Sequence, residues 1–194
     1  MRRPATALLA LALLACLVTA GCGNQRSEGL SLAAEPSEET VEHRYPEVGL
    51  AFELPRNVIV RATEPPGVFR GDFGGAVVSG FAYRREERLP GDDVELRTAK
   101  RRLERAAEER DRSFELRDSR TTEVSGSRAV ELLGDQTISS GKLRIRSLHV
   151  YEGRAEYVLE LLAPSEEFAR LDPALFAVLR RSLVVTGRVK RRSG

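Results

Sequence analysis

The chain is poor in the residues that build most disulfide, redox and metal sites. Among 194 residues there are no Trp, one Met, two His and two Cys. Both cysteines, Cys16 and Cys22, lie in the opening segment, so no residue after position 22 can form a disulfide or a thiolate metal site. We therefore expect a domain that is stabilised by its core alone.

An excess of charge of one sign is also missing from the body of the chain. The 31 Lys and Arg nearly balance the 29 Asp and Glu, and Arg2 and Arg3 are the only charges before position 22. Residues 22–194 thus carry 31 − 2 = 29 positive and 29 negative side chains. Because a nucleic-acid-binding domain needs a concentrated basic face to release phosphate counterions, we expect no nucleic-acid partner.

Patterns that carry catalysis or cofactor binding are scarce. His43 and His149 are far apart in the sequence, and there is no G-x-S-x-G elbow to present a serine nucleophile. Residues 67–80 are rich in Gly but have neither the G-x-G-x-x-G nor the P-loop spacing, so we interpret residues 67–75 as a loop between strands. We expect no enzyme, no catalytic residue, no cofactor and no metal site.

Residues 1–21 have the three parts of an export signal. Arg2 and Arg3 precede an apolar run over residues 5–20, and small residues follow. At 1.5 Å per residue this run spans roughly 24 Å, less than the roughly 30 Å hydrocarbon core of a bilayer. We therefore expect a cleaved signal peptide and not a spanning helix.

Residues 18–22, VTAGC, resemble the lipobox of bacterial lipoproteins, although Thr19 stands where Leu is usual. The sequence ending at Cys16 fits the same box, but cleavage there would leave apolar residues on the mature end, whereas polar residues follow Cys22. An ordinary secretory signal with an incidental Cys is the other alternative. The resemblance implies lipid attachment at Cys22, hence contact with membrane lipid and a location at the extracytoplasmic face of a bacterial cell membrane. Two acyl chains give stable anchoring.

The remaining chain divides into a tether, one domain and a short tail. Residues 22–40 hold the lipidated Cys and a polar segment with too little apolar surface to fold, so we expect a disordered tether. Residues 41–187 are long enough for one hydrophobic core. Residues 188–194 form a basic tail, which could touch anionic lipid or wall polymer or be a frayed end.

The domain alternates strand patterns with two helical segments. We expect strands over residues 50–54, 57–62 and 76–83, then four strands over 114–124, 127–138, 142–151 and 154–163. The short turns between the last four predict antiparallel hairpins. Asp92 and Glu95 predict the start of a helix over residues 92–110 with an apolar stripe at Leu96, Ala99, Leu103 and Ala106. Ser165 is expected to cap a last helix, which Pro173 restarts before a strand at 183–185.

Two stretches resemble the fold shared by the photosystem II protein PsbP, the Ran-binding protein Mog1 and many small bacterial lipoproteins. They are GLAFELP over residues 49–55 and the closing unit over residues 153–183. The resemblance covers residues 42–186 and implies an α+β fold, an α-β-α sandwich around an antiparallel sheet. A Trp commonly follows the first Pro in this family, and Val58 or Ile59 would have to fill its space.

The resemblance also implies a binding or assembly role, because known members act mainly by docking to other proteins. We expect a non-catalytic module that docks a protein partner through the exposed face of its sheet or through residues 67–75. The alternative is a carrier or sensor of a small apolar or cell-wall-derived ligand, held in a groove between sheet and helix. An apolar cavity of several hundred Å³ would favour the carrier, and an exposed apolar patch would favour docking.

Overall fold

The computed structural model of the chain describes residues 35–139 and 141–189. The predicted signal peptide, Cys22 and residues 190–194 of the tail lie outside the described residues. The strands are β1 (Thr40–Tyr45), β2 (Leu50–Pro55), β3 (Ile59–Ala62), β4 (Gly67–Phe73), β5 (Ala76–Arg84), β6 (Glu115–Val124), β7 (Ser127–Ile138), β8 (Gly141–Glu152), β9 (Ala155–Pro164) and β10 (Val184–Val185). The helices are α1 (Asp93–Arg110), α2 (Phe168–Leu171), the π-helical turn η1 (Asp172–Phe176) and α3 (Ala177–Ser182).

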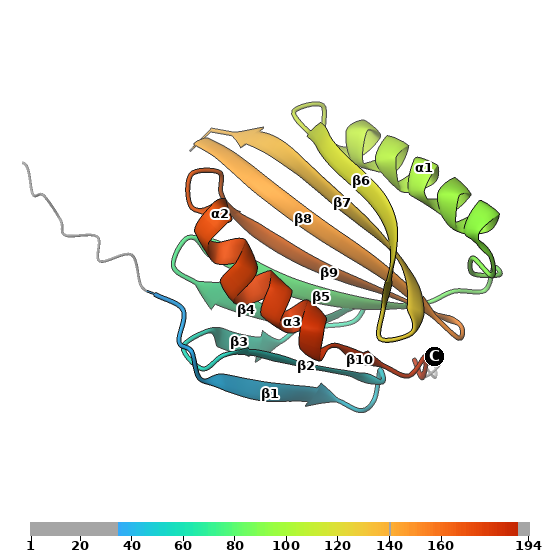
Figure 1. The fold of residues 1–194 in the computed structure, drawn as a ribbon, viewed down its shortest axis with the longest axis horizontal. Coiled ribbons are helices and arrows are strands. Elements are labelled where there is room, and N and C mark those ends of the chain that lie inside the picture. Colours follow the sequence, from blue (N-terminus) through green and yellow to red (C-terminus); the bar gives the residue numbers. More distant parts are fainter. Residues whose placement is uncertain (1–34, 140, 190–194) are drawn as a thin grey trace, which may run out of the picture. The chain divides into compact units, whose positions relative to one another are not determined.

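The strands form two antiparallel sheets. The large sheet has the order β3-β4-β5-β9-β8-β7-β6, and the small sheet has the order β1-β2-β10. Helix α1 packs on β6 and β7, while α2, η1 and α3 pack on β9 and β2 on the other face of the large sheet (Figure 1). The predicted α+β class, with helices on both faces of an antiparallel sheet, is confirmed.

The core is divided by the large sheet. On β7, Ala129 points into the main core between the two sheets and the C-terminal helices, and its neighbour Val130 points toward α1. The main core is built around large buried side chains such as Phe52, Phe69 and Phe176. The smaller core holds Leu96 of α1 against the sheet. This alternation is the period of two that a sheet buried on both faces requires.

Local signals placed α1 and the four consecutive strands correctly. The Asp92 side chain accepts hydrogen bonds from the backbone N–H of Val94 at 2.9 Å and of Glu95 at 2.8 Å, so the predicted cap is confirmed. Ser125 and Gly126 both have positive φ, as a two-residue hairpin turn requires. Strands β6 to β9 follow as antiparallel hairpins, as predicted.

The predicted loop over residues 67–75 is wrong, because residues 67–73 form β4. Val68, Phe69 and Phe73 are buried there, and the turn is confined to residues 74 and 75. A side chain at Gly71 would come within 2.9 Å of the Val58 Cγ1 atom, so this Gly serves close packing inside a strand. Docking through a Gly-rich loop at this position is therefore withdrawn.

Three smaller expectations are also corrected. Residues 40–45, for which no strand was predicted, form β1, a mostly exposed strand that contains His43 and has no alternating apolar pattern. Ser165 does not cap α2, which has no side-chain cap, and the Ser165 hydroxyl is buried without a hydrogen-bond partner. Ala106 is exposed, so the apolar stripe of α1 ends at Leu103. Of the two residues proposed to replace the family Trp, Val58 is buried and Ile59 is exposed.

Candidate functional site

Helix α1 covers only part of its side of the large sheet. Its main contacts are with β6 and β7, and on β8 it packs with Tyr151, so most of the same side of β8, β9 and β5 lies away from the helix. We call this surface the open face. Its side chains are Val77, Ser79, Phe81 and Tyr83 of β5, Glu156, Val158, Glu160 and Leu162 of β9, and Leu143, Ile145, Ser147 and His149 of β8. Most of them are half-buried, and none points into the main core.

The register of the strands arranges the open face in rows. Phe81 pairs with Val158, which pairs with His149, and this row is mainly apolar. The next row is polar, with Ser79, Glu160 and Ser147. Aromatic side chains lie at the β5 edge, where Phe81 and Tyr83 stack with ring centroids 6.4 Å apart. The guanidinium of Arg85 lies 5.0 Å from the centroid of the Tyr83 ring.

A hydrogen-bonded chain of polar side chains crosses the open face. The Ser147 Oγ atom lies 3.2 Å from His149 Nε2, and His149 Nδ1 lies 2.8 Å from Glu156 Oε1. Arg85 Nε donates to the other carboxylate oxygen of Glu156 at 2.7 Å. Burial alone would raise the pKa of Glu156, but hydrogen bonds and charge from His149 and Arg85 outweigh it and lower the pKa. Glu156 is therefore a buried, ionised anchor for His149.

The order Ser147, His149, Glu156 matches the order of groups in a hydrolase triad. A triad also needs N–H donors aimed at the developing oxyanion. Ser147 lies in the middle of a strand that is paired on both sides, so its backbone groups serve the sheet. Its hydroxyl also lies 3.4 Å from the carboxylate of Glu160, which would repel an oxyanion. The arrangement therefore places a nucleophile beside a base, while the backbone of Ser147 itself serves the sheet and Glu160 opposes an oxyanion.

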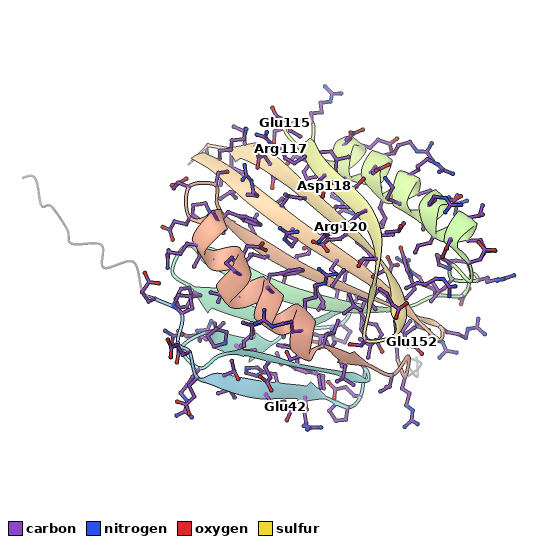
Figure 2. All side chains as sticks on the ribbon, in the orientation of Figure 1. Glu42, Glu115, Arg117, Asp118, Arg120 and Glu152 are labelled. Atoms are coloured by element: carbon purple, nitrogen blue, oxygen red, sulfur yellow. The ribbon has the colours of Figure 1, made fainter. Side chains whose placement is uncertain are left out.

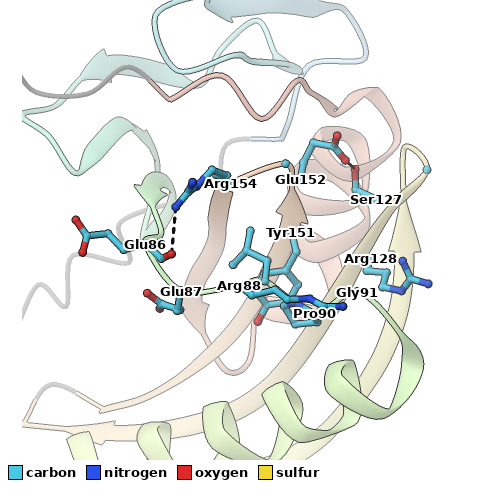
Figure 3. A pocket seen from close by; sticks show the side chains of 13 residues that line it. Glu86, Glu87, Arg88, Pro90, Gly91, Ser127, Arg128, Tyr151, Glu152 and Arg154 are labelled. Carbon is cyan, nitrogen blue, oxygen red and sulfur yellow. Dashed lines mark hydrogen bonds between the residues drawn. The ribbon is translucent and has the colours of Figure 1, made fainter.

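Two clefts lie next to the open face, on either side of the β5–α1 connection. We call residues 85–92 the strap. One cleft, of about 540 Å³, lies between the strap and the turns at residues 126 and 153 (Figure 3). The other, of about 440 Å³, lies between the strap, α1 and the sheet. The two clefts share five lining residues: Glu87, Arg88, Leu89, Pro90 and Tyr151.

Tyr151 lies beneath the strap and lines both clefts (Figure 3). The residue is 9% exposed and packs with Leu96 of α1 in the smaller core. Burial, followed by the charge of Glu156, raises the pKa of Tyr151, so the hydroxyl stays protonated. Ala99 and Leu103 of α1 add apolar surface to the smaller cleft. The site thus offers a hydrogen-bonding hydroxyl at the bottom of a partly apolar groove.

The structure separates the residues that the sequence singled out. His43 lies on the small sheet, with its ring centroid 5.5 Å from that of Phe52, whereas His149 belongs to the open face. The chain from Ser147 to Glu156 was missed by sequence reasoning. A signal was present, because Ser147 and His149 share one side of a strand and Glu156 follows the hairpin turn at Gly153.

Two further features bear on the site. No helix within residues 35–139 and 141–189 is long and apolar enough to cross a membrane. In the same residues no group of three or more His, Cys, Asp or Glu side chains is placed to hold a metal ion.

Two solved structures share this fold at low sequence identity. The cyanobacterial PsbP protein CyanoP from Synechocystis sp. PCC 6803 matches with a TM-score of 0.58 and 12% identity, over 81% of this chain and 95% of that chain. LpqN of Mycobacterium tuberculosis, described as involved in cell envelope biogenesis, matches with a TM-score of 0.54 and 13% identity, over 76% of this chain and 91% of that chain. No protein-family model and no curated protein matches the sequence. The domain has the PsbP-like fold, as residues 49–55 and 153–183 predicted.

Proposed function

We propose that this protein is a non-catalytic binding or assembly module that docks a protein partner through the open face. In this proposal, lipid at Cys22 attaches the protein to the extracytoplasmic face of a cell membrane. The observation that supports docking most is that β5, β9 and β8 present a half-buried aromatic and apolar surface, most of which lies away from α1. Aromatic residues and Arg are enriched at the centres of protein interfaces, and Phe81, Tyr83 and Arg85 supply both.

The polar groups of the open face also suit an interface. Burying an unpaired charge or hydroxyl under a partner would cost about 1 to 3 kcal/mol or more for each group. Here Glu156 is already paired with His149 and Arg85, and Ser147 is hydrogen-bonded within the domain. A partner can therefore cover the apolar rows without leaving these groups unsatisfied.

The extracytoplasmic location is supported by the export signal, by the lipobox-like residues 18–22 and by the fold shared with LpqN. A Cys22→Ser variant tests the attachment. After a high-salt wash the variant should be released from the membrane fraction while the natural protein stays. A variant that remains in the washed membranes would overturn lipid attachment at Cys22.

Site-specific photo-crosslinking in cells tests the docking surface. A photoreactive residue replacing Phe81 should give a reproducible adduct with one protein. The matched control places the same residue at Arg101, which is exposed on α1. Adducts of the same kind from both positions, or none from position 81, would contradict docking through the open face.

A second function, carriage of a small ligand, is favoured by one specific observation. Tyr151, which is 9% exposed, lines two neighbouring clefts of ligand size. Protein isolated from membranes would then retain a small molecule that native mass spectrometry detects. A Leu103→Trp variant, which fills the smaller cleft, should lose that small molecule. Losing the crosslink at position 81 should leave the small molecule bound.

A further inference from the structure

The side of the large sheet that faces away from α1 carries a cluster of cations. The C-terminal helices pack mainly on β9 and β2, and over β6, β7 and the first half of β8 they add side-chain contacts such as Arg180 with Glu131 and Asp172 with Arg146. We call this surface the basic face. Its cations are Arg117 and Arg120 of β6, Lys142, Arg144 and Arg146 of β8, and Arg180 of α3.

Two buried carboxylates hold these cations in place. Glu131 is 3% exposed and accepts hydrogen bonds from Arg120 at 2.9 Å and from Arg146, and Arg180 lies 3.3 Å away. Hydrogen bonds from Arg120 and Arg146 outweigh the burial of Glu131, so the pKa of Glu131 is lowered. The basic face is thus a row of guanidinium groups fixed over an ionised, buried acid.

The second buried carboxylate, that of Asp135, is surrounded by cations in the same way. Asp135 is 0% exposed and accepts hydrogen bonds from Arg144 at 2.7 Å and from Arg117 at 2.8 Å, and Lys142 lies 3.4 Å away. The Phe168 ring of α2 lies 5.8 Å from the guanidinium groups of both Arg144 and Arg146. Each buried acid therefore has three cations around it.

Cations outnumber acids by one on this surface, and the two acids at its centre are buried. The side chains of Arg117 and Arg120, which lie along the edge strand β6 (Figure 2), are 48% and 51% exposed, and that of Lys142 is 42% exposed. The six cations share the surface with five acids, and the two central acids are buried: Glu115, Asp118, Glu131, Asp135 and Asp172. Arg has five donors, so groups not used by the carboxylates remain available to an anion.

The chain enters the folded domain beside the basic face. Glu35, the first described residue, lies 3.3 Å from Arg170 of α2, and its backbone carbonyl accepts a hydrogen bond from Asn57 at 2.8 Å. Phe168, which contacts Arg144 and Arg146, is in the same helix as Arg170. The described chain therefore begins beside α2, whose Phe168 contacts the basic face.

We propose that the basic face binds the phosphate groups of anionic lipids in the membrane to which Cys22 attaches the protein. The proposal builds on the lipid attachment proposed above. Residues 22–194 are neutral as a whole, so bulk charge supplies no attraction and the local cluster must supply it. With the basic face on the membrane, the opposite side of the sheet, which carries the open face, is turned toward a partner.

Vesicle sedimentation tests the proposal without the lipid anchor. The protein used is residues 22–194 with Cys22→Ser, which contains every described strand and helix. It should bind vesicles that contain phosphatidylglycerol and not vesicles of phosphatidylcholine alone. The binding should disappear near 1 M salt, where the Debye length is only about 3 Å. Absence of binding to phosphatidylglycerol vesicles would overturn the proposal.

A matched pair of variants assigns the binding to the basic face. In Arg117→Gln with Arg120→Gln, Glu131 keeps Arg146 and Arg180 while Asp135 keeps Arg144 and Lys142, so both acids stay paired. Vesicle binding should fall about twenty-five-fold, because each of the two charges near an anionic surface contributes roughly a fivefold factor.

The control, Arg101→Gln with Arg105→Gln, makes the same charge change on exposed positions of α1 and should bind like the parent. Equal vesicle binding by the two double variants would overturn the assignment of binding to the basic face. Melting temperatures would confirm that both variants are folded. Lipid attachment is tested separately by the salt-washed Cys22→Ser variant, so either idea can fail alone.

Discussion

Replacing Asp135 by Asn would remove the charge around which three cations are arranged. Arg144 and Arg117 donate to this fully buried carboxylate at 2.7 and 2.8 Å, and Lys142 lies 3.4 Å away. Hydrogen bonds to a charged group contribute about 1.5 to 3 kcal/mol, and because the cations left behind are 30% to 48% exposed, water compensates part of their charge. We expect a loss of that size in the free energy of unfolding, with a correspondingly lower melting temperature.

Asp72→Asn is the matched control. Asp72 also accepts from two guanidinium groups, those of Arg61 at 3.0 Å and Arg70 at 2.9 Å, but its side chain is 34% exposed. Water screens such a pair, so the loss should be below about 1 kcal/mol. Urea unfolding followed by circular dichroism measures both variants. A loss for Asp135→Asn that is no larger than that for Asp72→Asn would refute the reasoning.

The same carboxylate predicts a pH dependence. The hydrogen bond from Arg144, followed by those from Arg117 and Lys142, outweighs burial and holds the pKa of Asp135 well below its usual value. Its contribution to stability is therefore complete above the unfolded pKa of about 3.9 and is lost as the pH falls toward the lowered folded pKa. Between about pH 5 and pH 2 the natural protein should lose more stability than Asp135→Asn. Parallel losses would contradict this.

Three further predictions concern packing and reactivity. Gly80→Ala should destabilise the domain by about 1 to 3 kcal/mol in urea unfolding, because the added Cβ would come within 2.2 Å of the Phe69 ring; a neutral result would mean that the ring moves freely. Tyr157→Phe removes a buried hydroxyl that donates to the Val48 carbonyl at 2.7 Å. We expect the free energy of unfolding to fall by about 1 to 2 kcal/mol in the same assay, and a change near zero would count against this hydrogen bond. Ser147 should not be labelled by a fluorophosphonate probe that labels a control serine hydrolase, since its own backbone groups serve the sheet and Glu160 lies beside its hydroxyl; stoichiometric labelling would contradict the non-catalytic proposal.

Much of the fold could be predicted because its signals are local. Asp92 caps α1 through its own side chain, and the turns at residues 125–126 and 153 follow from residues that tolerate positive φ. These signals need no knowledge of distant parts of the chain. They placed α1 and the strands β6 to β9 within a few residues of their observed ends.

The candidate site could not be predicted because it depends on long-range pairing. Strand β5 lies against β9, about 80 residues later in the chain, and this register places Phe81 beside Val158 and brings Arg85 to Glu156. No local pattern fixes which of several similar strands will be neighbours. Strand β1 was missed for a different reason, since it is exposed and polar and lacks the alternation that identifies a half-buried strand.

Hydroxyl-radical footprinting tests the role of the open face most directly. Oxidation of Phe81 and Tyr83, both half-buried at the β5 edge of that face, would be compared between the purified protein and the protein in native membranes. Tyr45, half-buried on β1 away from the open face, is the internal control. Docking predicts that Phe81 and Tyr83 are protected in membranes while Tyr45 is unchanged. Equal oxidation of Phe81 and Tyr83 in both samples would contradict the proposal that a partner covers this surface.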